Sequence, residues 1–210
     1  MGYGVGVHAP GITNSGTDDY VAAHNLLRAH AKAYRLYEST YKPTQQGSQT
    51  PFSKHFHAWS EPFLHTGRVG ITLNVGWDEP ENDDPANVEA AMRSTEFAMG
   101  WFGNAIFGDG DYPAVMIDQV RAIQVAYRSS LWLNGFGGQI GRKSQLQGFP
   151  KSRLPVFTEE EKIQLKGSSD FFGLNFYTSG IVRNKEADIN SVSYDADKDV
   201  EGYQDGSWYG

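Results

Sequence analysis

The sequence of 210 residues contains no cysteine. This absence excludes disulfide frameworks, cysteine-ligated zinc sites and thiol nucleophiles. No stretch approaches 18 consecutive apolar residues, so we expect no segment that spans a bilayer. The chain has 18 Lys and Arg against 25 Asp and Glu, a formal net charge of −7. An acidic balance argues against a nucleic-acid partner and against a surface made for anionic lipid.

What is present is a 39% hydrophobic composition with 24 glycines, typical of a soluble globular chain. Residues 2–11 have no charged region followed by an apolar one, so no signal peptide is predicted. Residues 204–210 stop in turn-forming residues without a closing helix or strand. We therefore expect both ends to be cuts through a longer chain.

Residues 15–42 have the clearest helical pattern. Ser15 with Asp18 resembles a capping box, and Lys42-Pro43 is expected to end the helix. Further helices are predicted over 85–101 behind Asp84, over 111–120, and after Thr158, where Glu161 completes a second capping box. The apolar positions of the first helix recur every three or four residues: Tyr20, Ala23, Leu27, His30, Tyr34, Tyr37 and Tyr41.

Two segments have the pattern of buried strands. Residues 68–75 are β-branched and apolar, and residues 170–178 have an apolar body that ends in polar groups. Helix, strand, helix, strand in this order predicts parallel pairing with helical crossovers, an α/β arrangement.

Several local patterns resemble sites but are better explained otherwise. The glycines at 2, 4 and 6 lack the spacing and the preceding strand of a nucleotide loop. His55, His57 and His65 are expected to be solvated, and the acidic residues 78–84 to form a solvated loop rather than a calcium site. No metal site is predicted. These patterns alone indicate an α/β protein and do not point to any particular function.

Motifs in a fixed order are more specific. Collinear over most of the chain, they resemble glycoside hydrolase family 1, the family of β-glucosidases, lactases and myrosinases. The segments that carry the resemblance are Gly2–Gly11, His24–Ala31, Arg68–Asn74, Gly100–Phe102, Gly110–Pro113, Lys151–Glu160 and Lys166–Thr178.

The resemblance implies part of a (β/α)8 TIM barrel, roughly from after strand four to after strand six. It also implies retaining hydrolysis of β-glycosides by two glutamates, without a metal or organic cofactor. A small β-glycoside is then the expected substrate, and a secreted or extracellular location is suspected from the family.

Both catalytic glutamates of the family are expected to lie outside this chain. The acid/base belongs to an Asn-Glu-Pro motif at the end of strand four, and the nucleophile to a Glu-Asn-Gly motif at the end of strand seven. Glu79-Pro80 is no substitute, because it is expected in a loop after strand five without a preceding asparagine, and Glu61-Pro62 is equally misplaced. We therefore expect no catalysis by the chain alone. The alternatives are a non-catalytic module that binds a glycan or a partner, and a non-functional gene product.

The resemblance assigns supporting roles to four residues. Asn175 and Tyr177 match positions that face the scissile sugar, and the Tyr177 hydroxyl would orient the nucleophilic carboxylate. His8 and Asn74 match positions on the leaving-group side of the cleft. Two tryptophans, Trp77 and Trp101, could stack on sugars, although burial in a core is the commoner role.

Two stretches have no counterpart in the family pattern. Removing residues 48–67 or 122–141 leaves a continuous family-like sequence on either side. Our hypothesis is that both stretches are retained introns or gene-model errors, and real surface loops are the alternative. With strand edges and an apolar helix face left uncovered, we expect the chain alone to be poorly soluble or molten.

Overall fold

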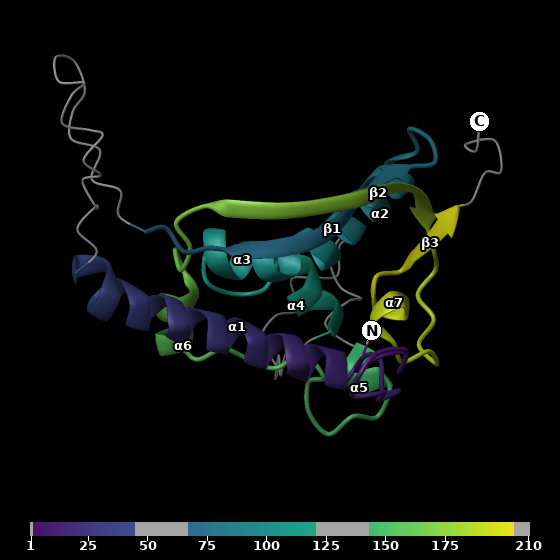
Figure 1. The fold of residues 1–210 in the computed structure, drawn as a ribbon. Helices are drawn as coiled ribbons and strands as arrows, with labels where there is room; N and C mark the ends of the chain where they lie inside the picture. The colour runs from purple at the N-terminus through teal and green to yellow at the C-terminus, as the bar shows by residue number, and fades with distance from the viewer. Residues whose placement is uncertain (1, 45–66, 121–142, 204–210) are drawn as a thin grey trace, which may run out of the picture.

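The computed structural model describes residues 2–44, 67–120 and 143–203 (Figure 1). Two π-helical turns, Tyr37–Tyr41 and Glu96–Gly100, and a 3-10 turn, Lys42–Thr44, occur besides the regular elements. The helices and strands are α1 (Asp18–Leu36), β1 (Ile71–Pro80), α2 (Pro85–Thr95), α3 (Trp101–Phe107), α4 (Ala114–Val120), α5 (Lys143–Leu146), α6 (Glu159–Leu165), β2 (Phe172–Asn184), α7 (Tyr194–Asp197) and β3 (Val200–Tyr203).

The three strands form one sheet in the order β1-β2-β3. β1 and β2 run parallel, with Asn74 opposite Asn175, so the predicted parallel α/β pairing is confirmed. β3 adds an antiparallel strand at the far edge of β2. The sequence pattern missed it, because four residues are too few to show a period of two.

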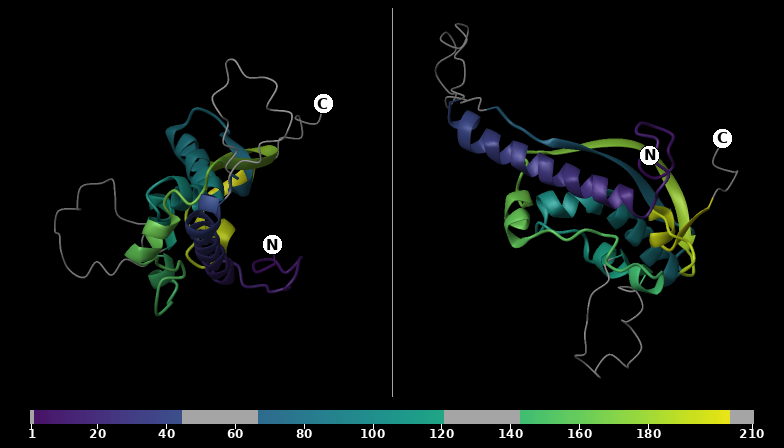
Figure 2. Two further views of the ribbon diagram at one scale, coloured as in Figure 1. Left: turned by 60° about the vertical axis from the view of Figure 1, so that its left-hand side comes forward. Right: turned by 90° about the horizontal axis from the view of Figure 1, so that it is seen from below.

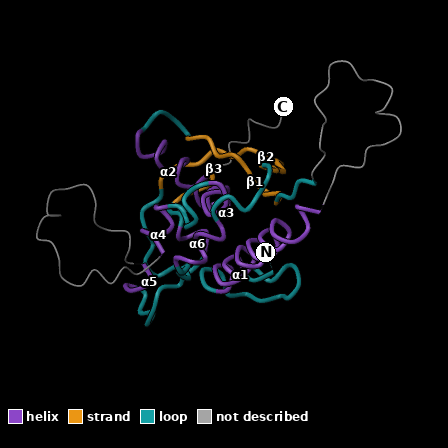
Figure 3. Tube along the Cα trace, turned by 90° about the vertical axis from the view of Figure 1, so that its left-hand side faces the viewer, coloured by secondary structure: helices purple, strands orange, loops and turns teal. Residues whose placement is uncertain are grey.

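The helices gather on one side of this sheet (Figures 2 and 3). Along β1, Leu73 and Val75 are buried while Thr72 and Asn74 are exposed, so one face of the strand packs on the helices and the other is open. The core between the helices and the sheet contains Tyr20, Leu27, Ala31, Phe97, Ala105, Ile106, Tyr112, Met116, Val120, Leu154, Phe157 and Leu165.

The first helix agrees with its predicted span and differs at its cap. α1 begins at Asp18, and Thr17 in the cap position makes no side-chain cap hydrogen bond. Instead Asp19 accepts from the Ser15 hydroxyl at 3.0 Å and from the Gly16 amide. The predicted pairing of Ser15 with Asp18 is therefore wrong, because the carboxylate one residue further on faces the free amides of the turn.

The other two predicted caps are confirmed. The Asp84 carboxylate accepts from the Ala86 amide at 2.9 Å, with Pro85 as the first residue of α2. Thr158 and Glu161 form a complete capping box at α6. In both cases a side-chain oxygen satisfies amides that the first helical turn leaves free.

Both parallel strands are longer than predicted. β1 continues to Pro80 and β2 to Asn184. In the added part the two strands pair from Trp77 opposite Ser179 to Pro80 opposite Val182. Glu79 is therefore a strand residue, and its expected place in a solvated loop was wrong. Glycine, acidic residues and proline have low strand propensity, and here the pairing with β2 overrides that preference.

Asp170 ties the end of α1 to the starts of the two parallel strands, β1 and β2. Its carboxylate accepts from the Tyr34 hydroxyl at 2.9 Å, from Lys42 Nζ at 2.7 Å and from the Val69 amide at 2.9 Å. Burial alone would raise the pKa of Asp170, but these three donors together hold it below its usual range. The last turn of α1 is thereby fixed against the sheet.

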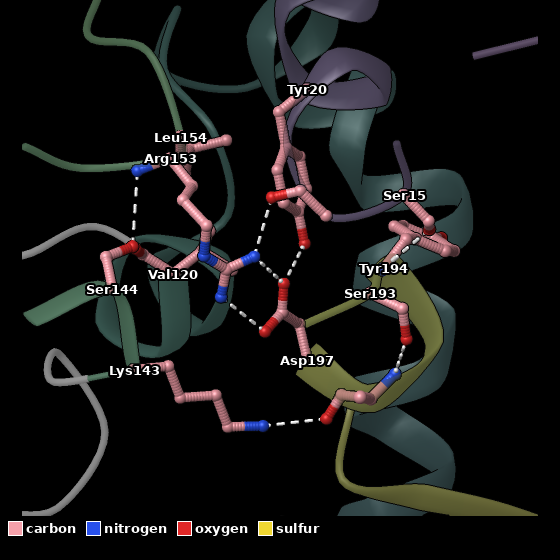
Figure 4. Close-up of polar contacts among 12 residues, drawn as sticks. Ser15, Tyr20, Val120, Lys143, Ser144, Arg153, Leu154, Ser193, Tyr194 and Asp197 are labelled. Carbon is pink, nitrogen blue, oxygen red and sulfur yellow. Dashed lines mark hydrogen bonds and ion pairs between the residues drawn. The ribbon is translucent and has the colours of Figure 1, made fainter. Parts of the chain in front are cut away.

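A buried ion pair holds the opposite end of α1 (Figure 4). Arg153 donates to both carboxylate oxygens of Asp197, at 2.6 and 2.7 Å, and the Tyr20 hydroxyl donates to the same carboxylate at 2.8 Å. Arg153 also donates to the Gly16 carbonyl at 2.7 Å. Burial and then the neighbouring carboxylate raise the pKa of Tyr20 well above its usual value. This cluster joins α1, α7 and the segment before α6.

The two proposed insertions, 48–67 and 122–141, lie outside the described residues except for Gly67, and so do His55, His57 and His65. In the ranges that the structure does describe, no helix has the length and apolar character needed to cross a membrane.

Candidate functional site

Two asparagines meet across the parallel strands on the open face of the sheet. Asn175 Nδ2 donates to Asn74 Oδ1 at 2.9 Å, and both residues are exposed. This bond fixes how each amide is presented. It leaves Asn175 Oδ1 as an acceptor and Asn74 Nδ2 as donors, and neither atom has another partner within the described chain. The pair therefore offers complementary hydrogen-bonding groups on one surface.

Tyr177 follows two residues later, where the pairing is irregular. Phe176 pairs with Val75 and Ser179 with Trp77, so Tyr177 and Thr178 together lie opposite Gly76. Such a bulge changes the direction in which a side chain points from the strand. The Tyr177 ring is 71% exposed, and its hydroxyl makes no hydrogen bond to another described residue. The hydroxyl is thus available as a donor.

Trp77 and Glu79 form a second polar contact near the end of β1. The indole Nε1 donates to Glu79 Oε1 at 2.6 Å, and the Trp77 ring is 47% exposed. Between them, Asp78 accepts from the Ser94 hydroxyl at 2.6 Å. The sequence pattern predicted a loop for these carboxylates and gave no indication of the contact. The signal that could have revealed it is the exposed Trp-x-Glu alternation, which continues the strand period of two.

The remaining two predicted residues, His8 and Trp101, make no hydrogen bond to the asparagine pair within the described chain, although Trp101 lines the same cavity as Asn74. His8 is exposed in the turn before α1, where its carbonyl accepts from the Gly11 amide at 2.8 Å. Within the described chain it has no recorded contact with Asn74, Asn175 or Tyr177. The Trp101 ring stacks on Tyr194, with centroids 5.2 Å apart, and packs against the core. Trp101 therefore has a packing role, which is the commoner of the two roles considered for it from the sequence.

The chemistry of this surface suits a neutral polyhydroxy ligand. Amide groups and a phenol can exchange hydrogen bonds with hydroxyls, and an exposed indole can stack on the apolar face of a sugar. Among the residues described, no group of three His, Asp or Glu is arranged to hold a metal ion.

Known proteins of similar sequence and structure show the family of this chain. The family model "Glycosyl hydrolase family 1" matches residues 1–209. The chain belongs to this family. Its membership confirms the resemblance inferred from the ordered motifs.

The relatives show how much of the family fold the chain represents. It is 38% identical over 209 residues to the lactase-like protein of Mus musculus, covering 99% of this chain and 30% of that one. It is 33% identical over 211 residues to the cytosolic β-glucosidase of Cavia porcellus, covering 100% and 36%. Compared with these two family 1 relatives, the chain spans about a third of their length.

A solved structure gives the same proportion. The chain matches aphid myrosinase with a TM-score of 0.74 and 30% identity, covering 100% of this chain and 36% of that one. The mixed α/β fold is therefore that of about a third of a family 1 structure.

Proposed function

We propose that this chain is the substrate-side portion of a retaining β-glycosidase, with Asn74, Asn175 and Tyr177 as its ligand-facing residues. The observation that carries the proposal is the Asn74–Asn175 hydrogen bond beside the exposed Tyr177, on the open face of a family 1 sheet. In this proposal the segment runs from after strand four to after strand six of the barrel, with β1 as strand five and β2 as strand six.

The proposed roles follow from the donors and acceptors that each residue has left. Asn175 Oδ1 and Asn74 Nδ2 would bond sugar hydroxyls and fix the position of the glycoside. The Tyr177 hydroxyl would donate to a nucleophilic carboxylate, which keeps that carboxylate ionised and oriented toward the anomeric carbon. His8 is proposed on the leaving-group side, with a smaller role.

The two catalytic glutamates are proposed to lie outside this chain. Retaining hydrolysis needs two carboxyl groups about 5 to 5.5 Å apart, one protonated and one ionised. Glu79 is a poor replacement for the acid/base, because its carboxylate accepts from the Trp77 indole at 2.6 Å and this favours the ionised form. The chain is therefore proposed to be inactive by itself, with no metal or cofactor involved.

A chimera tests the role of Tyr177 directly. In the chimera, the chain replaces the third of aphid myrosinase that it matches. The match includes 100% of this chain and 36% of myrosinase. We expect the chimera to hydrolyse a β-glycoside, and Tyr177→Phe to lower kcat by about tenfold or more, equivalent to about 1.4 kcal/mol of transition-state stabilisation. The matched control is Tyr41→Phe, at an exposed tyrosine beyond the end of α1. A Tyr177→Phe chimera as active as the Tyr41→Phe one contradicts the role.

The exposure of this surface also supports a second function, glycan binding without cleavage. Asn74, Asn175, Trp77 and Tyr177 are all exposed, so a sugar can reach them in the chain as it stands. Calorimetric titration with cellobiose separates this function from a chain with no ligand. Heat that saturates, and that disappears in Asn175→Ala, favours a binding module.

A further inference from the structure

β1 changes the direction of its side chains at Gly76. Val75 is buried toward the helices, and Asp78 accepts from the Ser94 hydroxyl of α2 at 2.6 Å, so both residues face the helical side. They lie three positions apart, whereas regular alternation places residues on one face only at even spacings. The pairing with β2 is irregular at this point, between Val75 and Trp77. This irregularity reverses the two faces of the strand beyond Gly76.

The reversal puts Trp77 and Glu79 on the open face of the sheet. They flank Asp78, so their side chains leave the strand on the side away from α2. Ser179 of β2 lies directly opposite Trp77 and shares its face. Trp77, Glu79 and Ser179 are all exposed. With regular alternation, Trp77 would instead share the helical side with Val75.

Gly180 makes room for the contact that fixes this arrangement. It pairs with Asp78, and a Cβ atom at this position would lie 2.8 Å from Asp78 Oδ1. A side chain here would therefore displace the carboxylate from Ser94. The outward direction of Trp77 and Glu79 is thus built into the pairing of the two strands.

Trp77, Glu79 and Ser179 present groups that together suit a sugar ring. The indole Nε1 donates to Glu79 Oε1 at 2.6 Å, and this bond lies along the ring plane and leaves the ring face free to stack on a sugar. The second carboxylate oxygen of Glu79 and the Ser179 hydroxyl make no hydrogen bond to another described residue. Both can therefore exchange hydrogen bonds with sugar hydroxyls.

These three residues are separate from the asparagine pair. Asn74 and Trp77 lie three positions apart on β1, a distance of about 10 Å at the usual rise of a strand. One pyranose ring bound between Asn74 and Asn175 is too short to stack on the indole as well. Two or three linked rings reach from the asparagines to Trp77.

We propose that Trp77, Glu79 and Ser179 form an outer sugar subsite, which binds a further neutral sugar unit of a β-linked oligosaccharide. This inference rests on the proposed function, because the Asn74–Asn175 pair holds the first unit. The indole stacks on the outer sugar, and Glu79 accepts from its hydroxyls. The charge of Glu79 also rejects acidic sugars, since a carboxylate on the ligand is repelled at this position.

Calorimetric titration of the 210-residue chain separates the two subsites. The ligands are methyl β-glucoside, which fills the first subsite alone, and cellotriose, which reaches both. We expect cellotriose to bind more tightly by about tenfold or more. Equal affinities overturn the outer subsite and leave the proposed function in place. No saturable binding of either ligand contradicts the proposed function together with the outer subsite.

Substitution of Trp77 locates the added affinity. We expect Trp77→Ala to lower the affinity for cellotriose to that for methyl β-glucoside, which itself does not change, and Trp77→Phe to keep part of the preference. The control is Tyr41→Ala, at an exposed aromatic residue beyond the end of α1, which should change neither affinity. A loss of affinity for both ligands in Trp77→Ala shows a structural role and overturns the proposal.

The charge of Glu79 gives a test that a structural role would not pass. We expect the chain to bind cellobiose more tightly than glucosyl-β-1,4-glucuronic acid by about fivefold at low ionic strength. Glu79→Gln keeps an acceptor for the Trp77 indole and should remove most of this difference. Asp83→Asn removes an equal charge from an exposed residue after β1 and should leave the difference unchanged. The same preference in Glu79→Gln as in the wild type, or an equal effect of Asp83→Asn, overturns the role of Glu79.

Discussion

Arg153 and Asp197 form the most completely buried charged contact among the described residues, with side chains 1% and 0% exposed. The pair is bidentate, and Tyr20 donates a third hydrogen bond to the same carboxylate. A buried pair adds little over a well-packed apolar replacement, yet removal of one partner leaves an unpaired buried charge. The contact therefore makes the junction of α1 and α7 sensitive to single substitutions.

We predict that Asp197→Asn lowers the free energy of unfolding by about 3 to 5 kcal/mol, because the buried Arg153 guanidinium loses its counter-charge. Urea denaturation measures this. The control is Asp195→Asn, which removes a carboxylate 79% exposed and paired with Lys198. We expect a change within about 0.5 kcal/mol for the control. Similar losses in the two variants contradict this role of the buried pair.

His24 makes stability depend on pH. The side chain is buried, its Nδ1 lies 2.8 Å from the Tyr112 hydroxyl, and burial lowers its pKa. The unfolded chain, with a histidine pKa of about 6.5, therefore binds this proton more readily than the folded chain. The stability from neutral His24 is present above that value and is lost as the pH falls through the lower folded pKa.

We predict that His24→Gln reduces the loss of unfolding free energy between pH 7 and pH 5. Glutamine retains hydrogen-bonding capacity and has no titratable proton. His30, whose pKa burial also lowers, retains its own contribution in the variant, so the slope decreases without reaching zero. Denaturant midpoints at several pH values give the measurement. The same slope for the wild type and His24→Gln would show that His24 does not titrate in this range.

Residue types alone did not indicate the candidate site. Asn175 and Tyr177 carry no distinguishing period, so only the resemblance of residues 166–178 to a family motif pointed to them. The Asn74–Asn175 contact joins positions 101 apart in sequence. Its geometry depends on the register between β1 and β2, which a local pattern does not fix.

At the scale of elements, chain-local signals predicted helices better than strands. Asp84-Pro85 and Thr158 with Glu161 act within one helical turn, so their caps could be identified from sequence. The ends of β1 and β2 depend on each other across a long separation. Residues 76–80 belong to the strand because β2 lies beside them. Their composition gives no indication of this pairing.

The Thr158 capping box gives an element-scale prediction. Thr158→Ala removes the acceptor for the Glu161 amide and should lower the free energy of unfolding by about 1 kcal/mol. α6 carries Leu165 into the core, so its start is coupled to global unfolding. The control Thr40→Ala, at an exposed residue after α1, should change stability by less than half as much. A capping variant no less stable than this control contradicts the coupling.

At the scale of the whole molecule, the described residues form a packed helical side and a sheet that they cover incompletely. Phe172, Leu174 and Phe176 pair with Ile71, Leu73 and Val75 and share their face, yet they remain 48%, 44% and 55% exposed. Exposed apolar strands favour association. The buried cluster between the helices argues that packing persists, so we expect poor solubility to arise from self-association through the sheet. Of the two outcomes expected from the sequence, a poorly soluble chain or a molten one, the buried cluster favours the first, which stays a prediction.

The central proposal is that this family 1 chain supplies ligand-facing groups without the carboxylates that cleave the glycosidic bond. Release of 4-nitrophenol from 4-nitrophenyl β-glucoside by the purified 210-residue chain tests it most directly. We expect no release above the buffer rate, and the same result for Glu79→Gln. Turnover by the chain that Glu79→Gln abolishes would show that a catalytic carboxylate lies within these residues and would contradict the claim.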